Sequence, residues 1–205
     1  MKDSYNRATF DLQQHTGLAY NFDTLPEAEI KRLSRLKWSG DNYSGRIWNN
    51  TGELARQLKN EFLVNWMTGR SNRDVINSIA ERFDVGRNNA RRLVRTESAF
   101  FHNEMEALSY KDADIEQYRF VAVLDKRTSS FCREHDGKVY KVSERKTGIN
   151  YPPLHPWCRS TTVAHFDDMD LSNLERRARD PKTGKTMLVP ANMSYDDWRE
   201  KYVAK

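Results

Sequence analysis

Both cysteines of the chain lie three residues from a histidine, with Cys132 before His135 and Cys158 after His155. Thiolate sulfur and imidazole nitrogen are ligands of structural zinc, and two such pairs in one short segment match the spacing of a four-ligand site. The pairs flank a predicted hairpin, so a bound zinc ion would staple a small sheet that has little core of its own. The alternative is two buried reduced thiols, with His155 hydrogen-bonded inside the loop of residues 152–159.

The carboxylate of Glu97 falls in the middle of an apolar stripe on the helix predicted over residues 87–110. An unpaired buried charge is very costly, so we expect Glu97 to have a specific partner, which Arg127 or Arg159 could supply. The alternatives are a stripe that is only half buried, and arginines that face solvent and contact phosphate. Helical periodicity does not choose between these interpretations.

The segment after the first predicted strand carries side chains that are suited to fixing a turn, because Asp125 and Thr128 can bind nearby backbone amides. We expect the two stretches 125–137 and 152–162 to meet and build one structural centre. Its predicted members are Glu97, Asp125, Arg127, Thr128, Cys132, His155, Cys158 and Arg159.

The net charge is +5, and the whole excess lies in the second half of the chain. Residues 118–166 alone hold 9 basic and 4 acidic side chains. A locally basic module favours a polyanion or an acidic protein surface as partner. The candidates for phosphate contact are Arg91, Arg92, Arg95, Lys138 and Lys141. The alternative is an ordinary solvated basic face.

An enzymatic interpretation is a metal-dependent nuclease of the His-Asn-His type, built from His135, Asn150, His155 and His165. No adjacent pair of residues marks a general base, and neither a serine-nucleophile elbow nor a glycine-rich phosphate loop is present. The sequence therefore assigns no catalytic residue, and zinc is its one candidate cofactor.

Periodicity predicts an α+β fold, in which an N-terminal helical layer packs on a small antiparallel β-sheet, with a C-terminal arm and a short final helix. Residues 1–117 form the predicted helical region. Residues 118–166 form a small basic β module, which zinc could staple and which makes one compact domain with the helices. Residues 167–205 form the C-terminal arm and the short helix. The predicted strands are 118–124, 138–142 and 161–166, and Ser194 with Asp197 caps the final helix.

Composition agrees with a folded domain, because 11% of the residues are aromatic, although the mean hydropathy is −0.88. No apolar run approaches the roughly 20 residues of a membrane span. The first residues are not followed by an apolar stretch, so the sequence does not predict a secretory signal. We therefore expect no membrane partner.

Five segments, in order, carry a family pattern: residues 38–48, 92–99, 124–132, 136–140 and 152–162. Together they resemble the C-terminal part of phage minor capsid or head morphogenesis proteins, the Mu F-like family of tailed bacteriophages. The tail around residues 191–198 is similar as well.

The resemblance implies a low-copy virion protein that associates with the portal and the capsid interior after assembly in the host cytoplasm. It implies a role in head assembly and in handling or ejecting packaged double-stranded DNA, without established catalysis. Some relatives carry a later toxin domain, and we expect none after residue 166. Relatives commonly have a longer N-terminal helical region, so we expect a short form or a fragment. In the family pattern the position of His135 is often not a zinc ligand.

Overall fold

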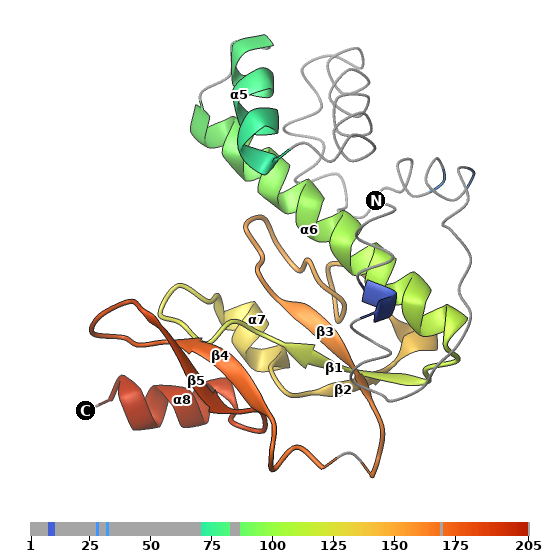
Figure 1. Cartoon of the computed structure of the whole chain (residues 1–205), viewed down its shortest axis with the longest axis vertical. Helices are drawn as coiled ribbons and strands as arrows, with labels where there is room; N and C mark the ends of the chain where they lie inside the picture. The colour runs from blue at the N-terminus through green and yellow to red at the C-terminus, as the bar shows by residue number, and fades with distance from the viewer. Residues whose placement is uncertain are drawn as a thin grey trace. The chain divides into compact units, whose positions relative to one another are not determined.

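The computed structural model describes residues 8–10, 28, 32, 71–82, 87–168 and 170–204 (Figure 1). Its helices and two small antiparallel sheets confirm the α+β class. Most of the predicted helical region before residue 70, including the family segment 38–48, lies outside the described residues. Within the described part of the chain, no helix has the length and apolar character that crossing a membrane requires.

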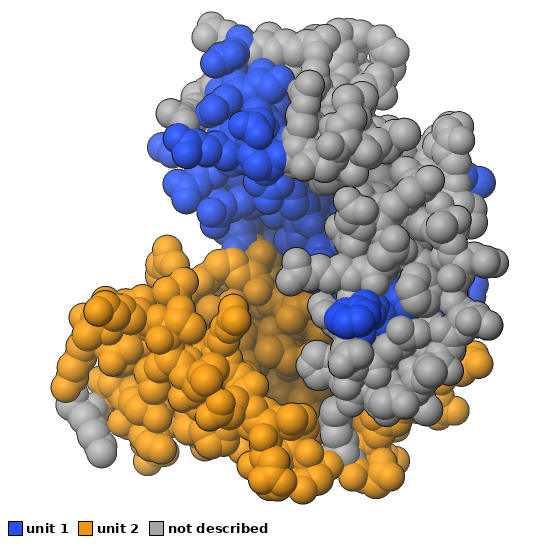
Figure 2. All heavy atoms as spheres, viewed as in Figure 1, with its two compact units in different colours: residues 1–113, 155–157 blue, residues 114–154, 158–205 orange. Residues whose placement is uncertain are grey.

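The contacts divide the chain into two compact units (Figure 2). The first unit comprises residues 1–113 with the short segment 155–157, and the second comprises residues 114–154 and 158–205. The predicted β module, apart from residues 155–157, and the predicted C-terminal arm therefore belong to one unit.

Two helices make up most of what the structure describes of the first unit. Helix α5 (Asn72–Arg82) begins after Ser71, whose hydroxyl accepts from the Asp74 amide and donates to the Asp74 carboxylate, which caps the start of the helix. Helix α6 (Arg87–Asp112) is the longest helix among the described residues and packs against α5. The predicted apolar stripe on α6 is buried at Ala90, Leu93, Val94, Phe101 and Met105, whereas Leu108 is half-buried.

The second unit contains a three-stranded antiparallel sheet in the order β2-β1-β3. The strands are β1 (Gln117–Val121), β2 (Val139–Lys141) and β3 (Thr161–His165), close to the predicted positions. Tyr118 and Phe120 of the central strand are fully buried, while their neighbours along the strand are half-buried, which is the alternation that predicted a strand.

Between β1 and β2 the chain forms the short helix α7 (Ser130–His135), which the sequence analysis did not predict. Ser129 caps its start by accepting a hydrogen bond from the Cys132 amide. A turn at Asp136 and Gly137 follows, and Gly137 adopts φ +79°, a conformation that favours glycine. A single turn of 3-10 helix, η1 (Val142–Glu144), comes after β2.

The predicted arm, residues 167–190, contains two strands that were not predicted. Strands β4 (Glu175–Arg179) and β5 (Thr186–Pro190) pair antiparallel there as a separate two-stranded sheet. Helix α8 (Tyr195–Tyr202) then carries the predicted capping box of Ser194 and Asp197. The hairpin was missed because its polar residues conceal a weak apolar alternation.

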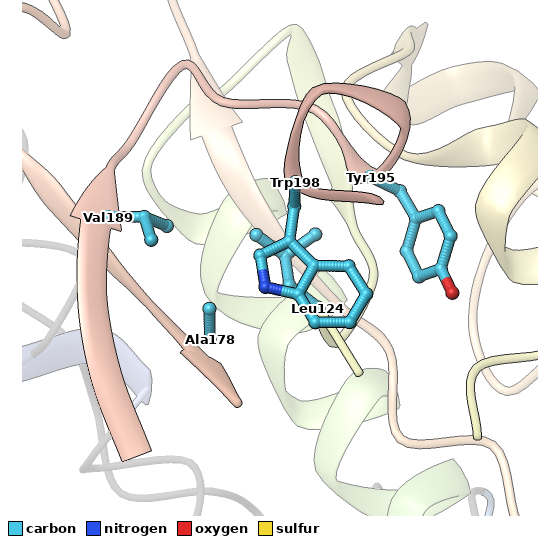
Figure 3. Close-up of a cluster of buried hydrophobic side chains, with 5 residues drawn as sticks. All are labelled: Leu124, Ala178, Val189, Tyr195 and Trp198. Carbon is cyan, nitrogen blue, oxygen red and sulfur yellow. The ribbon is translucent and has the colours of Figure 1, made fainter. Parts of the chain in front are cut away.

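A small core holds this hairpin and α8 together (Figure 3). The buried side chains are Leu124, Ala178, Val189, Tyr195 and Trp198. Trp198 is completely buried, and Leu124 forms an isolated bridge with Ala178 of β4. The end of the β1 segment is therefore attached to the hairpin by both backbone and side-chain contacts.

Candidate metal centre and buried ion pairs

The centre begins with the turn that follows β1. Asp125 accepts a hydrogen bond from the backbone amide of Arg127 at 2.9 Å, and the Thr128 hydroxyl lies 3.0 Å from the same carboxylate oxygen. The Thr128 hydroxyl also bonds the Val123 carbonyl. The Asp125 and Thr128 side chains thus close the turn on itself.

Arg159, just before β3, forms a two-pronged ion pair with Asp125, whose side chain is only 5% exposed. Burial raises the pKa of the Asp125 carboxyl, but Arg159, Thr128 and the Arg127 amide outweigh burial and hold that pKa below its usual value. The hydrogen bonds with Asp125 in turn raise the pKa of Arg159. The Arg127 guanidinium lies 3.8 Å from Asp125 and is 78% exposed, so it adds a weaker contact.

The two cysteines are buried beside this ion pair, and both are free thiols. Their sulfur atoms lie 3.6 Å apart within a cluster that also buries Phe120 and Ala122. The hydrogen bond with Cys158 lowers the pKa of Cys132 to about 6, although burial opposes it, and Ser129, Ser160 and Arg159 act in the same direction. The shared proton and burial raise the pKa of Cys158. One member of the pair is therefore poised to ionise, as a metal ligand must.

The ligand atoms of Cys132, His155 and Cys158 all lie within 4.8 Å of one another. The His155 Nδ1 atom lies 2.6 Å from the Pro156 carbonyl, to which it must donate, so Nε2 is the nitrogen that would bind a metal. Two thiolates bound to one tetrahedral zinc ion at about 2.3 Å would lie about 3.8 Å apart, close to the separation of the sulfurs here. This cysteine-histidine-cysteine group could hold a metal ion.

His135, the fourth predicted zinc ligand, is not a member of this group. Its Nδ1 atom lies 2.6 Å from the Tyr140 hydroxyl, and its ring packs against Phe120. Burial lowers the pKa of His135, and the charge of Lys138 contributes in the same direction. The structure thus brings three of the four predicted ligands together.

The residues of the nuclease interpretation have separate neighbours. The His165 Nδ1 atom lies 3.3 Å from the Arg119 guanidinium, and the Asn150 side-chain oxygen accepts from the Lys146 amide at 2.6 Å. With His135 on Tyr140 and His155 on the Pro156 carbonyl, each of the four side chains bonds a different group.

Asp136 forms a second buried ion pair, which was not predicted from the sequence. Its carboxylate is 1% exposed and accepts from Arg176 at 2.9 Å, from the Ala122 amide at 2.8 Å and from the Tyr195 amide at 2.8 Å. One carboxylate thereby connects the end of β1, strand β4 and the start of α8. The signal in the sequence was weak, because Arg176 lies two residues before Ala178, the one buried apolar residue of β4.

The remaining site candidates lie on the surface of their own units. Arg91 and Arg95 of α6 are exposed, as are Lys138 and Lys141 at β2, whereas Arg92 is half-buried. The Arg95 guanidinium lies over the Trp157 ring, 5.9 Å from its centroid.

Glu97 is half-buried on α6, within a stripe whose apolar members are mostly buried. The structure pairs both Arg127 and Arg159 with Asp125. A pairing of Glu97 with one of these arginines stays a prediction.

Comparison with known proteins adds one family and one relative. The chain is 23% identical over 212 residues to the NAD(+)–arginine ADP-ribosyltransferase EFV of Enterococcus faecalis (strain ATCC 700802 / V583). That alignment covers 96% of this chain and 42% of the relative, so the chain spans less than half of that protein. No solved structure matches the chain. The model of the phage Mu protein F like family matches residues 56–163, which include both cysteines and the Asp125–Arg159 pair, and the chain belongs to this family.

Proposed function

We propose that this chain is a low-copy minor component of a phage head that acts in head morphogenesis. The observation that supports this proposal is the family match over more than half of the chain, from α5 to β3. The partners that fit this role are the portal and capsid proteins. The location that fits it is the capsid interior, reached from the host cytoplasm during assembly.

The buried centre serves this role as a structural support rather than as an active site. Residues 124–128, α7 and the segment before β3 have little apolar core of their own, because one small cluster buries only Phe120, Ala122 and the two cysteines. Zinc held by Cys132, His155 and Cys158 would supply a cross-link between these segments, with one position left for a further donor. The Asp125–Arg159 pair supplies a second cross-link between the same segments.

Contact with packaged double-stranded DNA is part of the proposal. The exposed basic side chains at Arg91, Arg95, Lys138 and Lys141 suit phosphate contact without reading base sequence. Such contact would weaken strongly as salt is raised, because each neutralised phosphate releases a counterion.

Incorporation into particles tests the main proposal. Phage heads are assembled with and without this chain, purified on a gradient and analysed by quantitative mass spectrometry. We expect the chain in purified heads at a few copies for each portal, and fewer complete heads without it. A chain that never sediments with heads or portal rings would contradict the proposal.

Catalysis is tested separately on plasmid DNA with Mg²⁺, Mn²⁺ or Zn²⁺. We expect no cleavage. Cleavage that disappears in the His155→Ala variant would replace the structural role of the centre with a nuclease activity. The ADP-ribosyltransferase activity named for the Enterococcus relative belongs to a protein more than twice as long as the aligned segment, and we do not transfer it.

A further inference from the structure

The β4–β5 hairpin has two faces of opposite character. Ala178 and Val189 point into the core with Leu124 and Trp198 (Figure 3). On the other face, Arg177 lies opposite Leu188 and Arg179 lies opposite Thr186, and all four residues are exposed. The hairpin therefore presents an arginine-bearing ribbon to solvent while its other face is anchored.

The anchoring keeps the ribbon in one position within its unit. Arg176, between the exposed positions 175 and 177, forms the buried ion pair with Asp136. The Arg179 amide donates to the Leu124 carbonyl at 2.8 Å, which ties the end of β4 to the end of the β1 segment. Because these contacts already fix the backbone, binding a ligand on the outer face would cost little ordering entropy.

The tip of the hairpin adds two lysines to the same surface. The Asp180 carboxylate accepts from the Lys182 and Thr183 amides, both at 2.8 Å, and so closes the turn. Lys182 and Lys185 are exposed on either side of Gly184. The outer face and the tip together carry four exposed basic side chains, Arg177, Arg179, Lys182 and Lys185, against two carboxylates, Glu175 and Asp180.

We propose that this outer face and tip, the basic ribbon, bind the phosphate backbone of double-stranded DNA. The major groove of B-DNA is about 12 Å wide and admits a two-stranded ribbon. Residues two apart on a strand lie about 7 Å from each other, which is about twice the axial rise of 3.4 Å for each charge of one DNA strand. Arg177 and Arg179 have this spacing on one face. Leu188 is the one large apolar side chain exposed on this outer face, beside the exposed basic side chains. Charge therefore dominates the surface.

This inference rests on the proposed function only in that a phage head brings the chain close to DNA. It adds a binding element that lies outside the α6 and β2 candidates. An acidic protein surface is the alternative partner, and the experiment below separates the two.

The test measures binding of the full chain to a fluorescent 30-base-pair duplex by anisotropy at several salt concentrations between 50 and 200 mM. We compare the wild type with an Arg177→Ala/Arg179→Ala variant and with a matched Arg199→Ala/Lys201→Ala control, which removes two exposed charges from α8. The expected result is a salt slope about 2 lower in magnitude, and affinity at least tenfold weaker at 50 mM, for the ribbon variant alone. An Arg177→Lys/Arg179→Lys variant should keep most of the binding.

Arg179 also donates to the Gly184 carbonyl at 3.1 Å, so its loss could disturb the turn. A Lys182→Ala/Lys185→Ala variant removes two charges at the tip without this contact, and it should show the same reduction in slope. Equal losses in the ribbon variants and the α8 control would overturn the inference, as would binding lost only in an Arg91→Ala/Arg95→Ala variant. If the wild-type protein does not bind the duplex but binds portal rings through the ribbon, the inference is overturned and the partner of the ribbon is an acidic protein surface. Absence of the chain from purified heads would instead contradict the proposed function and leave duplex binding as measured.

Discussion

Asp125 and Arg159 lie 34 residues apart in the sequence, and their side chains meet in a two-pronged ion pair. The Asp125 carboxylate is also held by the turn that it closes, through the Arg127 amide and the Thr128 hydroxyl. Arg159 lies next to Cys158, so this pair fixes the segment that carries one of the two thiols. The ion pair therefore positions the candidate metal centre, and its loss has consequences beyond the pair itself.

Replacing Arg159 with alanine leaves the Asp125 carboxylate buried without its main partner. Breaking a buried pair costs about 3–5 kcal/mol, and we expect about 2–3 kcal/mol here because the Arg159 side chain is 32% exposed. The matched control is Arg127→Ala, which removes a more distant and more exposed arginine and should change the unfolding free energy by less than about 0.5 kcal/mol. Urea unfolding monitored by tryptophan fluorescence measures both. Equal changes in the unfolding free energy of the two variants would show that Arg159 does not stabilise Asp125 more than Arg127 does.

The same pair makes stability depend on pH in a predictable direction. The folded pKa of Asp125 lies below the ordinary value of 3.8, so its contribution is present above pH 3.8 and is lost as the pH falls through the folded pKa. The Asp125→Asn variant should therefore be less stable than the wild type at pH 7, and the difference should shrink on acidification below pH 3.8. Urea midpoints at neutral and acidic pH measure this. A difference that stays constant, or grows in acid, would contradict the role given to this carboxylate.

Local patterns predicted the elements whose signals are local. The long stripe of α6, the alternation along β1 and the Ser194–Asp197 cap of α8 each involve residues close in sequence. Helix α7 was missed because its six residues are too few for a helical repeat to appear. Strand β4 was missed because Ala178 is its one buried apolar residue, while a second inward position is filled by Arg176.

The candidate centre could be predicted by residue type but not by pairing. Cysteine and histidine spacing pointed to Cys132, His155 and Cys158, which the structure brings together. The same spacing included His135, whose Nδ1 atom instead meets the Tyr140 hydroxyl from the neighbouring strand. Partners across tens of residues depend on how the strands fold back, and periodicity within one element does not contain that information.

The Asp136–Arg176 pair should matter more for stability than any exposed arginine of the hairpin. The Arg176 side chain is 13% exposed and that of Asp136 1%, and the Asp136 carboxylate also accepts two hydrogen bonds from the Ala122 and Tyr195 amides, which depend on its position. We expect Arg176→Ala to cost about 3–5 kcal/mol, whereas Arg177→Ala, one residue along, should cost less than about 0.5 kcal/mol. Limited proteolysis provides a second measurement, because a released hairpin would be cut between residues 167 and 194. If both variants resist protease and urea alike, Asp136 is not the connection between β1, β4 and α8.

Metal content tests the three-ligand centre directly. Protein purified without chelator should contain about one equivalent of zinc by inductively coupled plasma mass spectrometry, and Cys132→Ser or Cys158→Ser should remove most of it, because each substitution deletes a thiolate ligand. His135→Ala is the matched control and should retain the metal, since His135 lies outside the group. Chelator should lower the melting temperature of the wild type and of His135→Ala, but should have little effect on the cysteine variants, which have already lost the cross-link. Less than a few tenths of an equivalent in the wild type, or equal metal in all four proteins, would instead identify Cys132 and Cys158 as ordinary buried thiols that support the fold by packing alone.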